Sequence, residues 1–289
     1  MEEAAIIGSG AMGAEMAQVM ATAGMRVLLL DSSTDFLTNA TGGIKASLDR
    51  LVKKKNMSEE AAGEVLKRIE PVVATNDYSC LANADLVLEV VPDKLALKEK
   101  VLKAVCATAK PSAIIASNTS SLSITRCAGF LPADRTARFA GLHLFDPVPA
   151  MKSVEVVQGL QTNDETIKEL MQLCLRLGKT GVPCIDCPGF ECNRILVPMI
   201  NEAMFAVSGG VAADADKVKK LGANYLMGQL LLADTIGLDR LLSVMDVLYQ
   251  EFEDSKYRAC PLLREMVDAG QLGRKTGKGF FDYGKRSKL

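Results

Sequence analysis

Residues 4–13, Ala4-Ala5-Ile6-Ile7-Gly8-Ser9-Gly10-Ala11-Met12-Gly13, decide the fold of this chain. A short apolar run typical of a buried strand leads directly into a Gly-x-Gly-x-x-Gly pattern, and a helix-forming segment follows to residue 23. In this context the first glycine permits a tight turn, the second lets the backbone approach a pyrophosphate, and the third allows close helix–strand packing. The helix start offers N–H groups to the phosphates. The stretch therefore predicts a dinucleotide-binding β-α unit.

A second apolar strand, residues 26–30, ends at Asp31, eighteen positions after Gly13. A carboxylate at this place can accept hydrogen bonds from the adenosine ribose hydroxyls and repels a 2′-phosphate, which favours NAD over NADP. The alternative is a glycine turn that only closes a tight β-α connection, with Asp31 capping a later helix. We expect NAD contacts from Gly8, Ser9, Gly10, Ala11, Met12, Gly13 and Asp31.

Strand-like and helical runs alternate along the first two thirds of the chain. The alternation predicts an α/β fold, a Rossmann-type, doubly wound parallel sheet with both faces covered. Two helices, expected at residues 35–55 and 58–68, interrupt it as an insertion, and the first carries an apolar stripe at helical spacing (Ile44, Leu48, Leu51, Val52). The further strands are expected at residues 71–74, 85–90, 113–116, 138–142, 154–157 and 180–185.

From Pro188 onward the signals are mostly helical. We therefore expect a boundary near residue 187, with an NAD-binding domain at 1–187 and an all-α domain at 188–289. A helix is expected at residues 164–177, ended by Gly178. In the second domain the helical signals lie at residues 190–207, 213–227, 238–253 and 261–271.

The composition limits which partners and which cellular compartment we expect. With 48% hydrophobic residues, 24% charged residues and a formal net charge of -1, the chain is typical of a globular protein without the broad basic surface that nucleic acid requires. No apolar run reaches the roughly 18 residues of a membrane span, and the acidic start predicts no export signal. Eight cysteines in apolar segments indicate free thiols in the cytoplasm. The Cys184–Cys187 pair has no second ligand pair, so no metal is expected.

His143 is the only histidine in the sequence, and it follows an apolar strand-like run. Glu155 comes twelve positions later, and Asp146-Pro147-Val148-Pro149 can turn the chain so that the two meet. An imidazole steered by a carboxylate suits the proton transfer that must accompany hydride transfer. The alternatives are a structural histidine at a strand end and a solvent-facing Glu155.

Six motifs, in order and compatibly spaced, resemble the 3-hydroxyacyl-CoA dehydrogenases, most closely the short bacterial 3-hydroxybutyryl-CoA dehydrogenases. They are GSGAMG (8–13), SNTSSLSIT (117–125), GLHLFDPVP (141–149), KSVEVV (152–157), PGFECNRILVP (188–198) and GRKTGKGFFDY (273–283). The resemblance implies a dinucleotide-binding domain, a helical domain that forms a homodimer, and hydride transfer between NAD and C3 of a short (3S)-3-hydroxyacyl-CoA thioester. It makes His143 the general acid/base, oriented by Glu155.

The same resemblance implies roles for further residues. Ser120 and Asn193 match the polar pair around the reacting 3-oxygen, although Ser120 could instead cap a helix starting near Leu122 and Asn193 could be an ordinary first-turn residue. Asp93 and Lys98 match positions around the nicotinamide ribose, with Asp93 in place of the usual glutamate.

Four cofactor and substrate positions remain. Asp146 stands where the family has asparagine in its His-x-x-Asn-Pro motif, so it puts a second carboxylate near the nicotinamide, and Lys275 matches another cofactor-linked position. Ser47 and Lys54 match the contacts of the coenzyme A part, although the run Lys53-Lys54-Lys55 could equally be a solvated helix end.

Two other functions stay open from the sequence. One is a dehydrogenase of a free 3-hydroxy acid or sugar acid such as L-gulonate, which would keep His143 and Glu155 but lack coenzyme A contacts. The other is a non-catalytic NAD-binding redox sensor that uses the Cys184–Cys187 pair.

Overall fold

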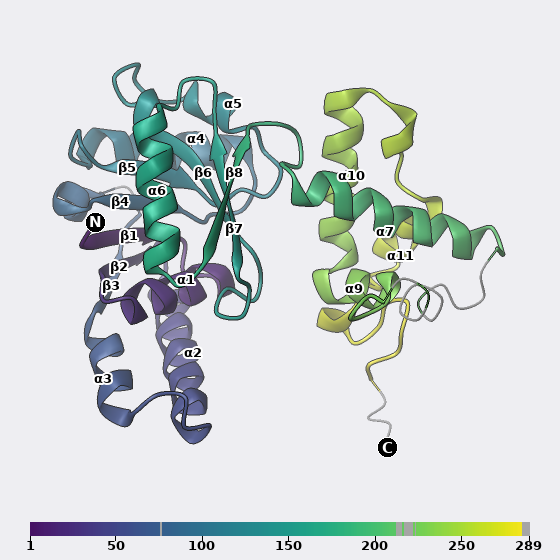
Figure 1. Cartoon of the computed structure of the whole chain (residues 1–289), viewed down its shortest axis with the longest axis horizontal. Coiled ribbons are helices and arrows are strands. Elements are labelled where there is room, and N and C mark those ends of the chain that lie inside the picture. The colour runs from purple at the N-terminus through teal and green to yellow at the C-terminus, as the bar shows by residue number, and fades with distance from the viewer. Residues whose placement is uncertain (76, 212–215, 217–221, 223, 285–289) are drawn as a thin grey trace. The chain divides into compact units, whose positions relative to one another are not determined.

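The computed structural model describes residues 1–75, 77–211, 216, 222 and 224–284. The chain folds into two compact units, Met1–Asp186 and Cys187–Leu289 (Figure 1). Each unit has its own buried apolar core, and each is described by itself.

The first unit is built on one eight-stranded sheet with the order β3-β2-β1-β4-β5-β6-β7-β8. Every predicted strand is present, with bounds that differ by at most two residues. The strands are β1 Glu3–Ile7, β2 Arg26–Asp31, β3 Ile69–Val73, β4 Leu86–Glu89, β5 Ile114–Ser117, β6 Phe139–Leu144, β7 Ser153–Gln158 and β8 Thr180–Ile185.

The prediction of a wholly parallel sheet is wrong for the last two strands. β7 runs antiparallel to β6, and β8 pairs parallel with β7, so both run against the other six. The physical reason is the connection at residues 145–152, which is too short for the crossover that a parallel neighbour requires. The chain therefore returns directly beside β6, and the sheet is mostly parallel.

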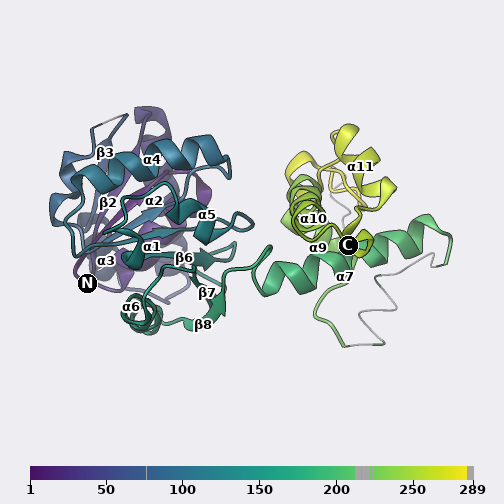
Figure 2. The ribbon, with the colours of Figure 1, turned by 90° about the horizontal axis from the view of Figure 1, so that it is seen from above.

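Helices cover both faces of the sheet, which explains why β4, β5 and β6 are buried along their whole length. Figure 2 shows α4 and α6 on opposite faces. The predicted end of α6 is confirmed, because Gly178 follows it with φ +68°. The covering helices are α1 Ala11–Thr22, α4 Leu95–Thr108, α5 Ile124–Ala128 and α6 Asp164–Arg176, with 3-10 turns η1 Ser79–Asn83 and η2 Thr136–Arg138.

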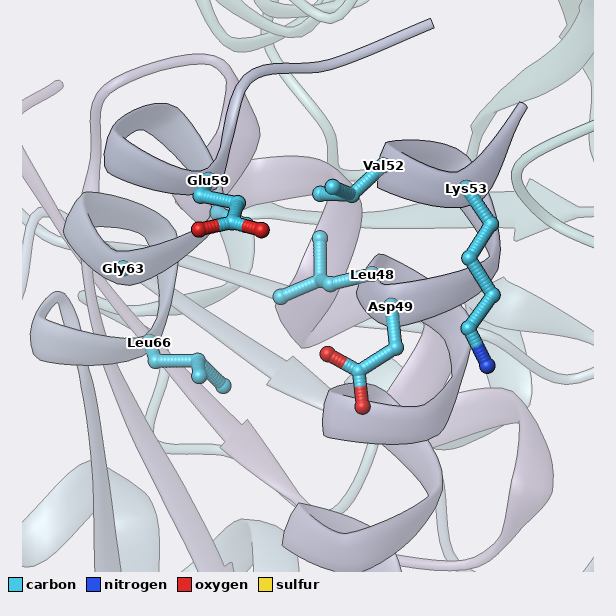
Figure 3. A pocket seen from close by; sticks show the side chains of 8 residues that line it. Leu48, Asp49, Val52, Lys53, Glu59, Gly63 and Leu66 are labelled. Carbon is cyan, nitrogen blue, oxygen red and sulfur yellow. The ribbon is translucent and has the colours of Figure 1, made fainter. Parts of the chain in front are cut away.

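The predicted two-helix insertion is present as α2, Thr34–Lys53, and α3, Glu59–Lys67. Ile44 and Leu48 of its apolar stripe are buried, and Leu51 and Val52 pack half-buried against the same core. A cavity of about 330 Å³ opens between the two helices, and Figure 3 shows Leu48 and Val52 at its apolar wall with Asp49, Lys53 and Glu59 around it.

The second unit is helical, as predicted. Its apolar core includes Ile200, Met204, Leu241, Met245 and Leu248. The helices are α7 Cys192–Ser208, α9 Gln229–Ile236, α10 Leu238–Phe252 and α11 Pro261–Asp268, with 3-10 turns η3 Ser255–Tyr257 and η4 Arg274–Thr276. Most of the helix predicted at 213–227 lies outside the described residues. Across the described residues, no helix is both long and apolar enough to span a membrane.

The start of α7 corrects one expectation. The helix begins at Cys192, two residues after the start of the predicted segment 190–207, because Gly189 and Phe190 take positive φ values of +74° and +50°. A Cβ on Gly189 would lie 2.9 Å from the Leu248 Cδ2 atom, so this turn requires glycine.

Candidate active site

The glycine turn has the geometry that its sequence predicts. Gly8 has φ +107°, and a Cβ on it would lie 2.8 Å from the Val90 carbonyl oxygen, while a Cβ on Gly13 would lie 1.9 Å from the Gly8 oxygen. Both contacts exclude any side chain. An added Cβ at Gly10 would meet nothing within 4 Å, so the backbone there borders open space at the start of α1. This cradle fits a diphosphate held by backbone amides.

Asp31 ends β2 beside this turn. Its Oδ2 atom accepts hydrogen bonds from the Ser9 amide at 2.8 Å and from the Ser9 hydroxyl at 2.9 Å. A carboxylate has further acceptor sites, so this contact shapes the turn and still leaves capacity for ribose hydroxyls. The alternative that Asp31 caps a helix is wrong, because α2 has Ser33 at its N-cap and shows no side-chain cap there.

A groove of about 430 Å³ runs from the glycine turn to α2. Ser47, predicted to contact coenzyme A, lines it, whereas Lys54 lies exposed just beyond the end of α2. The full lining is Ser9, Gly10, Ala11, Ala14, Glu15, Gln18, Phe36, Asn39, Ala40, Gly43, Ile44, Ser47 and Arg50.

His143 and Glu155 are direct partners across the antiparallel strands β6 and β7. The His143 Nδ1 atom lies 2.6 Å from Glu155 Oε2, and the residues are only 6% and 2% exposed. The idea of a solvent-facing Glu155 is therefore wrong. A carboxylate only accepts, so it fixes the proton on Nδ1 and leaves Nε2 as the acceptor nitrogen of the ring.

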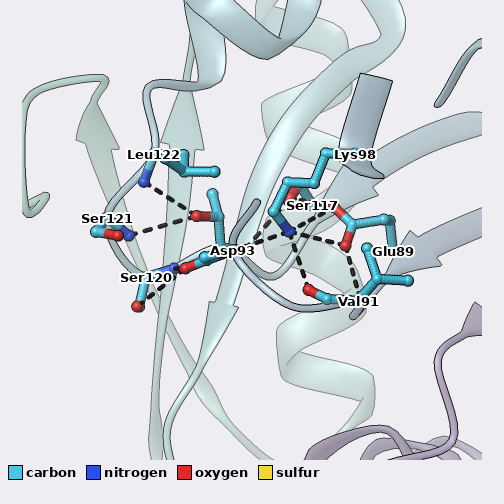
Figure 4. A network of polar contacts seen from close by, with 9 residues as sticks. Glu89, Val91, Asp93, Lys98, Ser117, Ser120, Ser121 and Leu122 are labelled. Carbon is cyan, nitrogen blue, oxygen red and sulfur yellow. Dashed lines mark hydrogen bonds and ion pairs between the residues drawn. The ribbon is translucent and has the colours of Figure 1, made fainter. Parts of the chain in front are cut away.

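A buried ionic network lies at the end of β4, around Glu89 and Lys98 (Figure 4). The Lys98 ammonium lies 2.8 Å from both carboxylate oxygens of Glu89, and neither side chain has any exposed surface. Ser117 donates to the same carboxylate at 2.7 Å. Lys98 also lies 3.1 Å from Asp93 Oδ1. Lys98 is fully buried and contacts Glu89, Asp93 and the Val91 carbonyl, so its cofactor role stays a prediction.

Asp93 connects this network to Ser120. Its Oδ2 atom accepts from the Ser120 amide at 3.2 Å and from the Ser120 hydroxyl at 3.3 Å. The alternative that Ser120 caps a helix is wrong, since Ser123 caps α5 by accepting from the Arg126 amide. The structure thus brings together three residues that the sequence motifs single out, Asp93, Lys98 and Ser120.

Sequence reasoning missed Glu89, Ser117 and Asn118. Asn118 accepts from the Leu144 amide at 2.9 Å, so it ties the end of the His143 strand to the Ser120 segment. Glu89 carried a usable signal, because it is the one carboxylate in the interior of the apolar run DLVLEV, which starts at Asp85, and a buried carboxylate must find a partner. Asn118 carried no such signal in the sequence apart from its place inside SNTSS.

Two predicted residues belong to the second unit. Asn193 lies in the first turn of α7, and its role at the reacting oxygen stays a prediction. Lys275 lies in η4, where its ammonium is 2.5 and 2.6 Å from the two carboxylate oxygens of Asp239. Burial opposes ionisation of Asp239, but Lys275 outweighs it and lowers the pKa of that carboxyl. The cofactor role of Lys275 is also a prediction still.

Residues 3–187 match the NAD binding domain of 3-hydroxyacyl-CoA dehydrogenase, and residues 189–283 match its C-terminal domain. The chain belongs to the 3-hydroxyacyl-CoA dehydrogenase family. The predicted family, fold class, enzyme class and NAD dependence are thereby confirmed.

Relatives of this dehydrogenase match over nearly their whole length. A 3-hydroxybutyryl-CoA dehydrogenase of Bradyrhizobium diazoefficiens is 46% identical over 285 residues, 98% of this chain and 96% of the relative. The human mitochondrial hydroxyacyl-coenzyme A dehydrogenase is 39% identical and covers 96% of this chain and 90% of its own. The crystal structure of an (S)-3-hydroxybutyryl-CoA dehydrogenase from Ralstonia eutropha has a TM-score of 0.93 at 43% identity, covering 99% and 100%.

Proposed function

We propose that this enzyme interconverts short (3S)-3-hydroxyacyl-CoA and 3-ketoacyl-CoA thioesters, with 3-hydroxybutyryl-CoA and acetoacetyl-CoA as its pair. The contact between His143 and Glu155 carries the proposal. β1 and β6 run in the same direction, so the glycine turn after β1 and His143 near the end of β6 lie at one edge of the sheet. Ligands of open α/β sheets bind at this edge.

His143 acts as the general acid/base. In the oxidative direction its Nε2 accepts the proton of the 3-hydroxyl group as the C3–H bond breaks, and in the reductive direction it returns that proton to the 3-oxygen. Bound NAD supplies the hydride acceptor, and bound NADH the hydride donor. Glu155 orients the ring and stabilises the imidazolium that forms.

Ser120 and Asn193 donate hydrogen bonds to the 3-oxygen in this proposal. The link from Lys98 through Asp93 to Ser120 supports the first role, because the Ser120 amide bonded to Asp93 holds the residue in place while its single hydroxyl proton turns from Asp93 to the 3-oxygen. Polarising the ketone in this way favours hydride arrival at C3.

Ser47 and Lys54 bind the coenzyme A tail. They are seven residues apart, about two helical turns, so they project along one stripe of α2. Arg50 lies between them on this stripe and borders the same groove as Ser47, which supports a phosphate-binding track.

The assembly and the compartment complete the proposal. We infer a homodimer formed through the helical unit, since its apolar side chains Ile195, Val211 and Leu226 are 65%, 83% and 98% exposed. Light scattering after gel filtration tests this. Six cysteines, Cys80, Cys106, Cys127, Cys174, Cys187 and Cys260, are free thiols, which supports a cytoplasmic location.

One assay tests the reaction. NADH absorbance is followed with acetoacetyl-CoA, with free acetoacetate, and in reverse with L-gulonate and NAD. Turnover with the thioester alone is the expected result. Equal turnover with free acetoacetate would overturn the coenzyme A assignment, and turnover retained by His143→Gln would overturn the acid/base assignment.

A further inference from the structure

The loop at residues 145–152 joins the strand of His143 to the strand of Glu155. It carries Asp146 at its exposed start, whereas the side chain of Val148 is fully buried. This loop therefore adjoins both strands of the pair and carries the carboxylate that replaces the family's asparagine.

Two charged side chains, Glu15 on α1 and Lys179 in the turn between α6 and β8, hold Val148. Its amide donates to Glu15 Oε2 at 2.6 Å, and its carbonyl accepts from the Lys179 ammonium at 2.6 Å. Lys179 also donates to the Met151 carbonyl at 2.7 Å. Hydrogen bonds to ionised groups are shorter and stronger than neutral ones, so they fix the loop more firmly than backbone contacts would.

Glu15 connects this loop to the glycine turn. It lies on α1, in the helix that follows the turn, and it borders the same groove as Ser9 and Gly10. Its bond to Val148 spans 133 residues of sequence, entirely within the first unit. One side chain therefore joins the phosphate-binding end of the site to the loop beside His143.

The surroundings of Glu15 oppose ionisation of its carboxyl group. Burial raises the pKa of Glu15, and the negative charge of Asp146 raises it further, while the Val148 amide lowers it. The Val148 hydrogen bond is thus the interaction that stabilises the charged form of Glu15 at this place.

We propose that Glu15 is a positioning residue for the cofactor site: by holding the Val148 amide, it sets the distance between the glycine turn and the loop that carries Asp146. It acts through this loop and takes no part in the chemistry. The inference rests on the proposed function for its effect on turnover, but its effect on NADH binding stands independently.

Three variants test the inference. Glu15→Ala removes the acceptor, Glu15→Gln keeps an acceptor oxygen without the charge, and Glu60→Ala is a control on the exposed first turn of α3. Two measurements are made on each: the NADH dissociation constant by fluorescence titration, and hydrogen exchange of the peptide that contains residues 145–152.

Glu15→Ala is expected to weaken NADH binding and to speed exchange of this peptide, each by about ten-fold, the effect of losing one charge-assisted hydrogen bond. Glu15→Gln is expected to recover most of both, and Glu60→Ala to match the parent chain. The inference is overturned if folded Glu15→Ala binds NADH and exchanges like the parent chain, or if Glu15→Gln is as defective as Glu15→Ala. Neither measurement uses the thioester, so failure of the proposed substrate would be seen separately.

Discussion

The His143 Nδ1 atom lies 2.6 Å from Glu155 Oε2, and the two residues are paired across adjacent strands rather than brought together by loops. Strand pairing fixes their spacing, because a slip of one residue would move Glu155 to the opposite face of the sheet. The pair is therefore held as rigidly as the core around it.

His143→Gln should lower kcat by about 10²–10⁴-fold, the usual contribution of a positioned acid/base. The NADH dissociation constant should stay close to that of the parent chain, because no cofactor-binding role is assigned to the imidazole. Steady-state assays with acetoacetyl-CoA and fluorescence titration with NADH measure the two effects. Weakened NADH binding with unchanged kcat would contradict the assignment.

Glu155→Gln should also reduce kcat, since the amide keeps the size of the side chain but not the charge that steadies the ring. Placed in the His143→Gln background, the same change should reduce kcat no further, because residues that act as one unit are not additive. The four kcat values form a double-mutant cycle. Independent, additive losses would show that Glu155 does not act through His143.

The Lys98–Glu89 pair gives a prediction for stability. Lys98→Met leaves the carboxylate of Glu89 buried without its cation, which should reduce the free energy of unfolding by about 3–5 kcal/mol. Adding Glu89→Gln to Lys98→Met should restore much of that loss, since no buried charge remains. Urea unfolding followed by circular dichroism measures both. A double variant less stable than Lys98→Met alone would count against this account.

Much of the fold could be predicted because its signals are local. The Gly-x-Gly-x-x-Gly turn, the apolar strands and the stripe from Ile44 to Val52 all depend on residues close in sequence. The reversed direction of β7 and β8 depends instead on which strand edge the chain can reach after residues 145–152. Periodicity in the sequence does not indicate strand direction, so the alternation of strands and helices predicts a parallel sheet throughout.

The residues of the site also differ in whether the sequence alone can identify them. His143, Glu155 and Ser120 could be found because they lie in recognisable motifs, and Asp93 because it follows the strand DLVLEV at a position that the family resemblance singles out. Glu15 could not, because its partner is the backbone amide of Val148, 133 residues away, and a backbone amide has no residue type to recognise.

The lysines of α2 give a test of coenzyme A binding. Lys54→Ala should raise KM for acetoacetyl-CoA by about five-fold, the scale of one exposed ion pair with a phosphate. KM for the N-acetylcysteamine thioester, which has no phosphates, should not change. Lys45→Ala is the matched control, because nine residues at about 100° each put Lys45 on the opposite side of α2. Equal effects on both thioesters would contradict a phosphate contact.

Asp85 gives a prediction for pH. Burial opposes its ionisation, but the Lys110 ammonium at 2.5 Å and the amides of Glu2 and Glu3 outweigh burial and lower the pKa of Asp85 to about 2. A pKa below that of the unfolded chain means stabilisation that is complete above about pH 4 and lost as pH falls toward 2.

Asp85→Asn should therefore reduce the free energy of unfolding at pH 7 by about 1–2 kcal/mol, a range that allows for solvent screening of a partly exposed pair. The difference from the parent chain should begin to shrink between pH 4 and pH 3, because the unfolded parent chain, in which Asp85 has its ordinary pKa of about 4, binds a proton there that the folded chain does not yet bind. The variant side chain binds no proton in either state. Denaturant unfolding at pH 7, 5, 4 and 3 measures it, with the exposed Asp268→Asn as control. A difference that grows below pH 4 would show that Asp85 does not stabilise the first strand through its charge.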